Sequence, residues 1–298
     1  MSWLTYPVTH YAFFRHGLAA GVMGGALCGL IGVYVVLRRM SYIGHGLSHA
    51  IFGGAVVSYV VQVNFFIGAG LWGLLSALII NAVARSRKIG ADAAIGIVTT
   101  AAFAFGVALI SAVTGFTINF EAALFGNILG VTLTQLAVLA GVSVITVGIV
   151  LLRYRQLLFL TFDPDVADAY GMSVRRMDAL FALILAATVV STMQILGVTL
   201  IAATIVIPAV IARLLTDSFR RMLVLATLLG ALCGAVGMYV SFYTNVASGA
   251  AIVLTMAGVF VLVYAATALI SRRRLQRLAP AGQNHTDELS GPVSVHIG

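Results

Sequence analysis

Long apolar runs that alternate with short polar clusters are the dominant pattern of this 298-residue chain. A helix needs about 20 consecutive apolar residues to cross the hydrocarbon core of a bilayer. Runs of this kind follow one another along the sequence. The predicted spans are 17–37, 43–63, 65–84, 93–114, 131–152, 179–195, 198–212, 222–243 and 247–270. The pattern predicts an all-α, polytopic transmembrane helical bundle.

The number of spans depends on residues 179–212, a stretch that is too long for one crossing. Gly197 lies near its middle and Pro208 lies further on, and both residue types interrupt helices. The stretch is therefore interpreted as two helices or one broken helix. Counts of eight and nine spans both remain open.

Small residues recur at helical spacing in two of these spans. Residues 25–36 (GALCGLIGVYVV) and 230–241 (GALCGAVGMYVS) are similar and carry glycines four residues apart. Small residues at this spacing let helix backbones approach closely in lipid. The predicted topology runs the two segments in opposite directions, so we interpret the similarity as a shared packing solution and not as an internal repeat.

Composition and charge exclude a water-soluble fold. The chain is 61% hydrophobic and 9% charged, whereas a soluble domain is about a quarter charged. The net charge of +8 comes from arginines grouped at the ends of apolar runs, so it indicates topology and not nucleic-acid binding. We expect an extracytoplasmic N-terminal segment (1–16), a membrane domain (17–270) with a cytoplasmic segment (153–178), and a basic, disordered cytoplasmic tail (271–298).

Two histidines four residues apart are the strongest candidates for chemistry. His45 and His49 share one helical face of the second span, with Ser48 beside them. Imidazoles at this spacing can share a transition-metal ion, although one helix supplies only half of a coordination shell. The alternative is that they form interhelical hydrogen bonds or lie near the interface. A zinc protease is disfavoured because Gly46 replaces the glutamate that would act as general base.

Other polar residues near the spans leave their roles open. Asp92 is interpreted as a charge at a helix N-terminus, and Glu121 as a solvated acid of an outside loop. Six polar residues of the interrupted stretch either line a translocation path or form interhelical hydrogen bonds. They are Thr188, Ser191, Thr192, Gln194, Thr199 and Thr204.

The segment 153–178 is the only sizeable hydrophilic insertion between two predicted spans. Pro164 near its start and Gly171 further on fit the usual beginning and end of a short helix. A short cytoplasmic helix joined to a span can act as a lever against a soluble partner.

Four separated blocks resemble the permease subunits of zinc, manganese and iron ABC importers, and the resemblance extends over residues 18–270. The blocks are VVLRRMSYIGHGLSHAIFGG, ALFGNILG, FDPDVADAYGMSVRRMDALFALILAATVV and QILGVTLIAATIVIPAVIARLLT. The resemblance implies a multi-pass protein of the bacterial inner membrane that pairs with a second copy of itself, two ATPase subunits and an extracytoplasmic metal-binding protein. No permanently bound cofactor is expected, and ATP would bind the partner.

The resemblance also implies residue roles. Asp165, Asp168, Gly171 and Met172 fall in the family's coupling helix, which docks into the ATPase. His49 matches a pore-lining metal ligand, whereas His45 stands where the family has aspartate, and FGG (52–54) replaces leucine-proline-glycine. Replacing a carboxylate by imidazole favours zinc over manganese. Ser48, Gln194 and Thr199 are further candidates for the path.

Rival functions each lack a feature in this sequence. The chain has no GxxxxGK[ST] motif, so ATP hydrolysis would belong to a separate polypeptide and the chain would not be an enzyme. A secondary metal transporter would need membrane-embedded acids, and the predicted spans contain no Asp or Glu. A permease for a metal chelate or vitamin shares the fold and remains the main alternative, and a structural scaffold is a weaker one.

Overall fold

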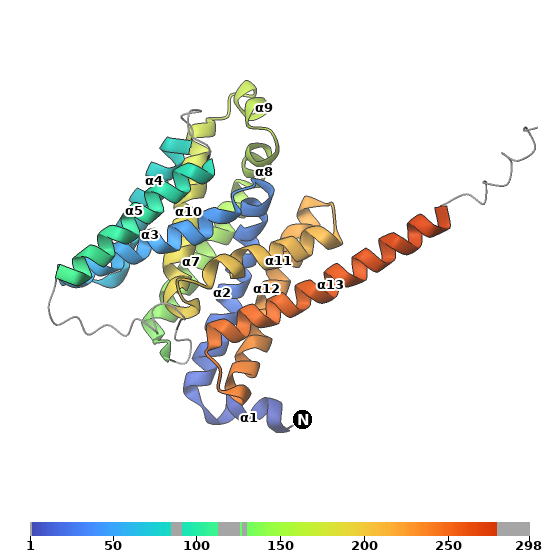
Figure 1. Ribbon diagram of the computed structural model, residues 1–298, viewed down its shortest axis with the longest axis horizontal. Helices are drawn as coiled ribbons and strands as arrows, with labels where there is room; N and C mark the ends of the chain where they lie inside the picture. Colours follow the sequence, from blue (N-terminus) through green and yellow to red (C-terminus); the bar gives the residue numbers. More distant parts are fainter. Residues whose placement is uncertain (1, 85–90, 113–125, 127–129, 279–298) are drawn as a thin grey trace, which may run out of the picture.

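The computed structural model describes residues 2–84, 91–112, 126 and 130–278, and its regular elements in these residues are helices (Figure 1). The helices are α1 (Ser2–His10), α2 (Ala12–Leu37), α3 (Ser41–Val60), α4 (Phe65–Ala84), α5 (Ala91–Ala112), α7 (Leu133–Leu152), α8 (Tyr154–Phe162), α9 (Pro164–Ala169), α10 (Val174–Leu196), α11 (Ile201–Leu215), α12 (Phe219–Thr244) and α13 (Ser248–Leu278). The predicted all-α class is confirmed.

Every predicted span falls on one of these helices. Six described stretches are long and apolar enough to cross a membrane, and three shorter apolar ones (Gly46–Val60, Ala93–Leu109 and Ile201–Leu215) complete the series. The count of eight or nine spans stays a prediction. Helix α13 continues past residue 270 to Leu278, and residues 279–298 of the expected tail lie outside the described residues.

The interrupted stretch forms two helices, as one of the two readings of the sequence predicted. Helix α10 ends at Leu196, and Gly197 follows with a φ of +89°, a conformation that glycine adopts without steric cost. Helix α11 starts at Ile201 and contains Pro208 as a buried residue of its interior. Gly197, and not Pro208, therefore makes the break.

Helix α2 is the centre of the bundle and packs against α12, α11, α7 and α10. Its contact with α12 is made of backbone on backbone. A Cβ added at Gly25 would collide with the carbonyl oxygen of Gly230, and one added at Gly29 would collide with that of Ala226. Since residue numbers rise along α2 as they fall along α12, the two helices are antiparallel. The predicted close packing and opposite directions are confirmed.

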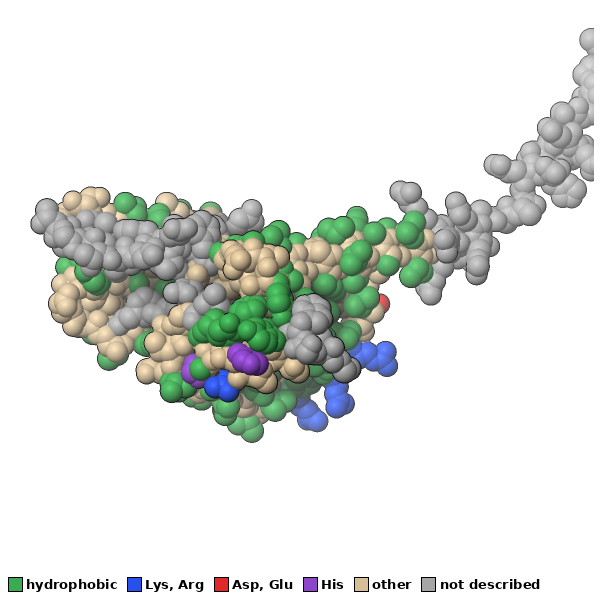
Figure 2. Space-filling view, turned by 90° about the horizontal axis from the view of Figure 1, so that it is seen from below, with side chains coloured by type: hydrophobic (Ala, Val, Ile, Leu, Met, Phe, Trp, Pro, Cys, Tyr) green, Lys and Arg blue, Asp and Glu red, His purple; other side chains and the backbone are tan. Residues whose placement is uncertain are grey.

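A second group of helices, α3, α4 and α5, lies beside this centre (Figure 1). Helix α3 packs against both α4 and α5, and it joins the centre through α11 and α10. Helix α13 leaves the bundle at a slant, and only 11% of its apolar window is buried. Figure 2 shows a patch of hydrophobic side chains on the face at the α1 end, with histidine and basic side chains beside it.

Candidate functional site

The histidine pair lies on α3, a continuous helix from Ser41 to Val60. An uninterrupted helix places His49 one turn after His45 on the same face, as the spacing predicted. The side chain of His45 lies outside the described residues, so the geometry of the pair is that of His49 and of the helix backbone.

The ring of His49 is half-buried against α5. It packs edge-on to Phe103, with ring centroids 5.1 Å apart and an interplanar angle of 72°. Glycines bring the two helices together on this side: Gly46 faces Thr99, and Gly53 meets Gly106. His49 therefore belongs to a tight contact between two helices and is not turned away from the protein.

Ser48 faces a different neighbour, the break between α10 and α11. It is fully buried, and its hydroxyl donates a hydrogen bond of 2.9 Å to the carbonyl oxygen of Val198. Interrupting a helix leaves carbonyl groups without their usual partners, and Ser48 satisfies one of them. This bond joins α3 to the irregular segment that contains Thr199, which is half-buried. The side chain of Gln194 lies outside the described residues.

Four other polar residues of α10 and α11 have hydrogen bonds inside their own helices. The hydroxyls donate to backbone carbonyl oxygens three or four residues earlier, a pattern that satisfies hydroxyls in apolar surroundings. The donors are Thr188, Ser191, Thr192 and Thr204. These intrahelical bonds support neither of the two roles weighed from the sequence, which were interhelical bonding and path lining.

Metal-binding groups are sparse within the described part of the chain. It contains no cluster of three or more His, Cys, Asp or Glu side chains that could hold an ion. Cys28 and Cys233 are free and buried, one in α2 and one in α12. Asp92 stands in the first turn of α5, as expected for a helix N-terminal charge, and Glu121 lies outside the described residues.

The predicted short helix of segment 153–178 is α9. The Asp163 carboxylate accepts a hydrogen bond of 3.0 Å from the Val166 backbone N–H, and Pro164 occupies the first helical position. Gly171 follows the helix with a φ of +74°. Asp165, Asp168 and Gly171 are exposed and Met172 is half-buried, so this turn is accessible at the end of the molecule (Figure 1). Helix α8 in front of it was not predicted.

An ion pair at the end of this segment was also missed. Arg38 at the end of α2 donates to Asp178 in α10 at 2.7 Å, and its guanidinium lies 4.7 Å from the ring centroid of Phe181. An arginine at the end of one apolar run and an acid at the start of another were visible in the sequence. Their 140-residue separation concealed the pairing.

Comparison with known proteins gives a consistent result. A model of the ABC 3 transport family matches residues 10–267. The manganese transport system membrane protein MntC of Halalkalibacterium halodurans is 38% identical over 267 residues, which cover 89% of this chain and 91% of that protein. The chelated iron transport system membrane protein YfeD of Yersinia pestis is 31% identical over 273 residues, covering 91% and 92%.

A solved structure agrees in fold as well as in sequence. PsaBC from Streptococcus pneumoniae in complex with Fab contains a chain with a TM-score of 0.79 and 33% identity, covering 88% of this chain and 95% of that one. The match of the family model spans most of the described helices. The chain belongs to the ABC 3 transport family and is an integral membrane protein with an ABC permease-type fold.

Proposed function

We propose that this chain is the membrane-spanning permease subunit of an ABC importer for a divalent transition-metal ion, with manganese as the favoured cargo. Family membership supports the permease role. The names of MntC and YfeD refer to manganese and to chelated iron. Manganese therefore replaces zinc, which the imidazole at position 45 had favoured.

The observation that carries the proposal is the position of His49. An ionisable group held inside a membrane protein is costly and marks an ion path by default. His49 packs against Phe103 of α5, and the neighbouring Ser48 bonds to the α10–α11 break. Binding sites of transporters commonly form beside interrupted helices. His45 and His49 would bind the ion, and Ser48, Gln194 and Thr199 would line the path beside it.

Ligands from outside the histidine pair would complete the coordination shell. The described residues of one chain offer no group of three His, Cys, Asp or Glu side chains that could hold an ion. Carboxylate, carbonyl and water oxygens suit manganese, so oxygen ligands would join the histidine nitrogens. The ion is the substrate of this site, which must bind it weakly enough to release it.

The connection from α9 to the site suggests how ATP drives transport. Asp165, Asp168, Gly171 and Met172 would contact an ATPase subunit, one on each of two permease copies. Helix α9 leads directly into α10, and α10 ends at the break that Ser48 holds. Movement of α9 would therefore shift the α10–α11 break against α3. Metal would arrive from an extracytoplasmic binding protein.

The test is metal uptake by the complex of permease and ATPase reconstituted in proteoliposomes. We expect His49→Ala to reduce manganese uptake by about tenfold or more, because replacing even a residue that only supports a metal ligand has an effect of about this size, while ATPase assembly is retained. His10→Ala is the matched control, because His10 is exposed in α1. Unchanged uptake in His49→Ala would refute the ion path.

Competition between manganese, zinc and iron in the same assay identifies the cargo. His45→Asp restores the carboxylate of the family pattern and should shift preference further from zinc toward manganese. The name of YfeD supports a second candidate function, a permease for chelated metal. A chelate permease needs a wide cavity, so its transport would be insensitive to both His49→Ala and His45→Asp.

A further inference from the structure

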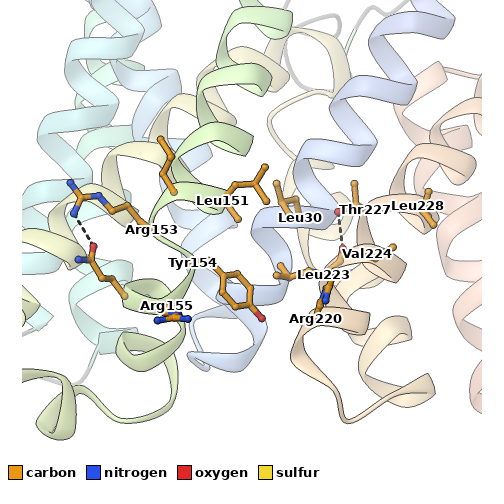
Figure 3. A pocket seen from close by; sticks show the side chains of 13 residues that line it. Leu30, Leu151, Arg153, Tyr154, Arg155, Arg220, Leu223, Val224, Thr227 and Leu228 are labelled. Carbon is orange, nitrogen blue, oxygen red and sulfur yellow. Dashed lines mark hydrogen bonds between the residues drawn. The ribbon is translucent and has the colours of Figure 1, made fainter. Parts of the chain in front are cut away.

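A groove of about 920 Å³ runs between α7–α8 and α12, away from the histidine pair. Both α7 and α12 pack against α2, and Leu30 of α2 lies between them (Figure 3). Helix α2 therefore forms the floor of the groove, and α7, α8 and α12 form its walls.

The walls of this groove are apolar and uncovered. Leu151 and Leu152 on α7 are 70% and 86% exposed, and Val224 and Leu228 on α12 are 54% and 53% exposed. These side chains lie in two helices that are long and apolar enough to cross a membrane. In a bilayer these side chains would face hydrocarbon, so acyl chains could lie in the groove between its walls.

Three arginines stand at one end of the groove. Arg153 and Arg155 come from the α7–α8 junction and Arg220 from the first turn of α12. Figure 3 shows Arg155 and Arg220 on opposite walls with Tyr154 between them. Arg153 donates to the side chain of Gln156 at 3.0 Å. None of these three arginines forms an ion pair with a described carboxylate, because the Arg38–Asp178 pair lies elsewhere in the fold.

We propose that this groove is a binding site for an anionic phospholipid. The guanidinium groups of Arg155 and Arg220 would hold the headgroup phosphate, and the acyl chains would lie along Leu151, Val224 and Leu228. Arginine recognises phosphate through several N–H donors. Basic pockets between membrane helices on the cytoplasmic side are suited to anionic headgroups, and arginine-rich helix ends are those expected on that side.

A second copy of the chain fits this surface less well. In an isologous interface the same patch of both subunits meets across the two-fold axis. Such a contact would bring two sets of three arginines together, none of them held in an ion pair with a described carboxylate, and juxtaposed like charges oppose association. An anionic lipid instead brings a negative charge that would balance these arginines.

The test is lipid retention by the full-length permease in detergent, measured by native mass spectrometry. Phosphatidylglycerol and phosphatidylcholine are added in equal amounts. We expect phosphatidylglycerol to be retained preferentially, and the double variant Arg155→Gln/Arg220→Gln to weaken its binding about 25-fold, from a loss of about fivefold for each arginine. Arg175→Gln/Arg176→Gln is the matched control, because it removes the same charge from exposed positions outside the groove.

A second variant tests the apolar part without changing charge. Val224→Trp places a larger side chain in the groove, where the acyl chains would lie. It should reduce phosphatidylglycerol retention while leaving the arginines in place. Equal retention of both lipids, or an equal loss in the control pair, would overturn the proposal. Displacement of the lipid by inorganic phosphate would indicate a free-phosphate site, and a dimer that dissociates on Arg155→Gln/Arg220→Gln substitution would indicate a protein interface; either result also overturns it.

Discussion

Arg38 and Asp178 are held between two helices with side-chain exposures of 11% and 18%. Charges this deep are favourable only as a pair, and removing one partner leaves the other without compensation. The Phe181 ring beneath Arg38 restricts the guanidinium further. This pair fixes the end of α2 to the start of α10, next to the turn that leads from α9.

Asp178→Asn should lower the free energy of unfolding by about 2 kcal/mol, because the Arg38 charge remains in place without a carboxylate. Thermal unfolding of the detergent-solubilised chain measures this effect. Arg39→Gln is the control, since Arg39 is exposed and forms no ion pair in the described structure. An equal loss in both variants would show that the pair contributes nothing specific.

Ser48→Ala should destabilise the chain by about 1–2 kcal/mol, because the variant removes a buried hydrogen bond to the Val198 carbonyl oxygen. Ser58→Ala is the matched control: Ser58 is also a buried serine of α3, but its hydroxyl bonds to Gly54 within the same helix. Chemical unfolding of both variants distinguishes the two bonds. A similar cost for each would argue against a special role for the link to the break.

Residue-level expectations succeeded where the spacing was local. His45 and His49 share a helical face because four residues make about one turn, and that follows from the sequence. The bond from Ser48 to Val198 joins positions 150 residues apart, and no local pattern encodes it. The metal roles of the histidines stay predictions until uptake is measured.

At the scale of elements, glycine spacing determines how α2 and α12 meet. Gly25 and Gly230 touch through backbone atoms, so each helix presents a flat strip to the other. Dispersion contacts of this kind stabilise helix pairs in lipid, where apolar burial gives no advantage.

Gly25→Ala should prevent this contact and lower the thermal unfolding temperature of the solubilised chain by several degrees, because the new methyl group would collide with the Gly230 carbonyl oxygen. Gly141→Ala makes the same chemical change in α7, where nothing lies within 4 Å of the added atom. The control should be neutral or slightly stabilising, since alanine favours helix. If both variants behaved alike, close backbone packing would not be the reason.

Helix positions were predictable because each span is a long apolar run, but the short helices were not all foreseen. Helix α9 carried a recognisable start at Asp163 and Pro164. Helix α8 mixes the buried Leu157 and Leu160 with the exposed Phe159 and Phe162. Such a nine-residue amphipathic segment is too short to stand out beside the charges that flank it.

At the scale of the whole molecule, the sequence predicts which ends of the bundle face the cytoplasm. The α9 turn and the loop after α12 lie at opposite ends of the structure (Figure 1). The assignment of the α9 end to the cytoplasm follows from the positive-inside rule. The fold class and the family could be predicted from the sequence. The cargo and the partners could not, because they depend on contacts with other molecules.

Cysteine labelling in intact cells tests this orientation. Tyr170→Cys replaces a side chain that is 77% exposed beside α9, and Val246→Cys replaces one that is 43% exposed after α12. We expect a membrane-impermeant maleimide to label Val246→Cys from outside and to reach Tyr170→Cys only after permeabilisation. The native Cys28 and Cys233 are buried and serve as the background. Labelling of both positions from one side would contradict the topology.

The bare-backbone contact between α2 and α12 also limits how the protein can move. Glycine has no side-chain rotamers, so the α2–α12 contact cannot adjust by repacking side chains. Sliding one helix along the other would force larger side chains into a space that excludes even a methyl group. The two helices should travel as one rigid body through the transport cycle. The deformation that opens and closes the permease then falls on the looser contacts around them.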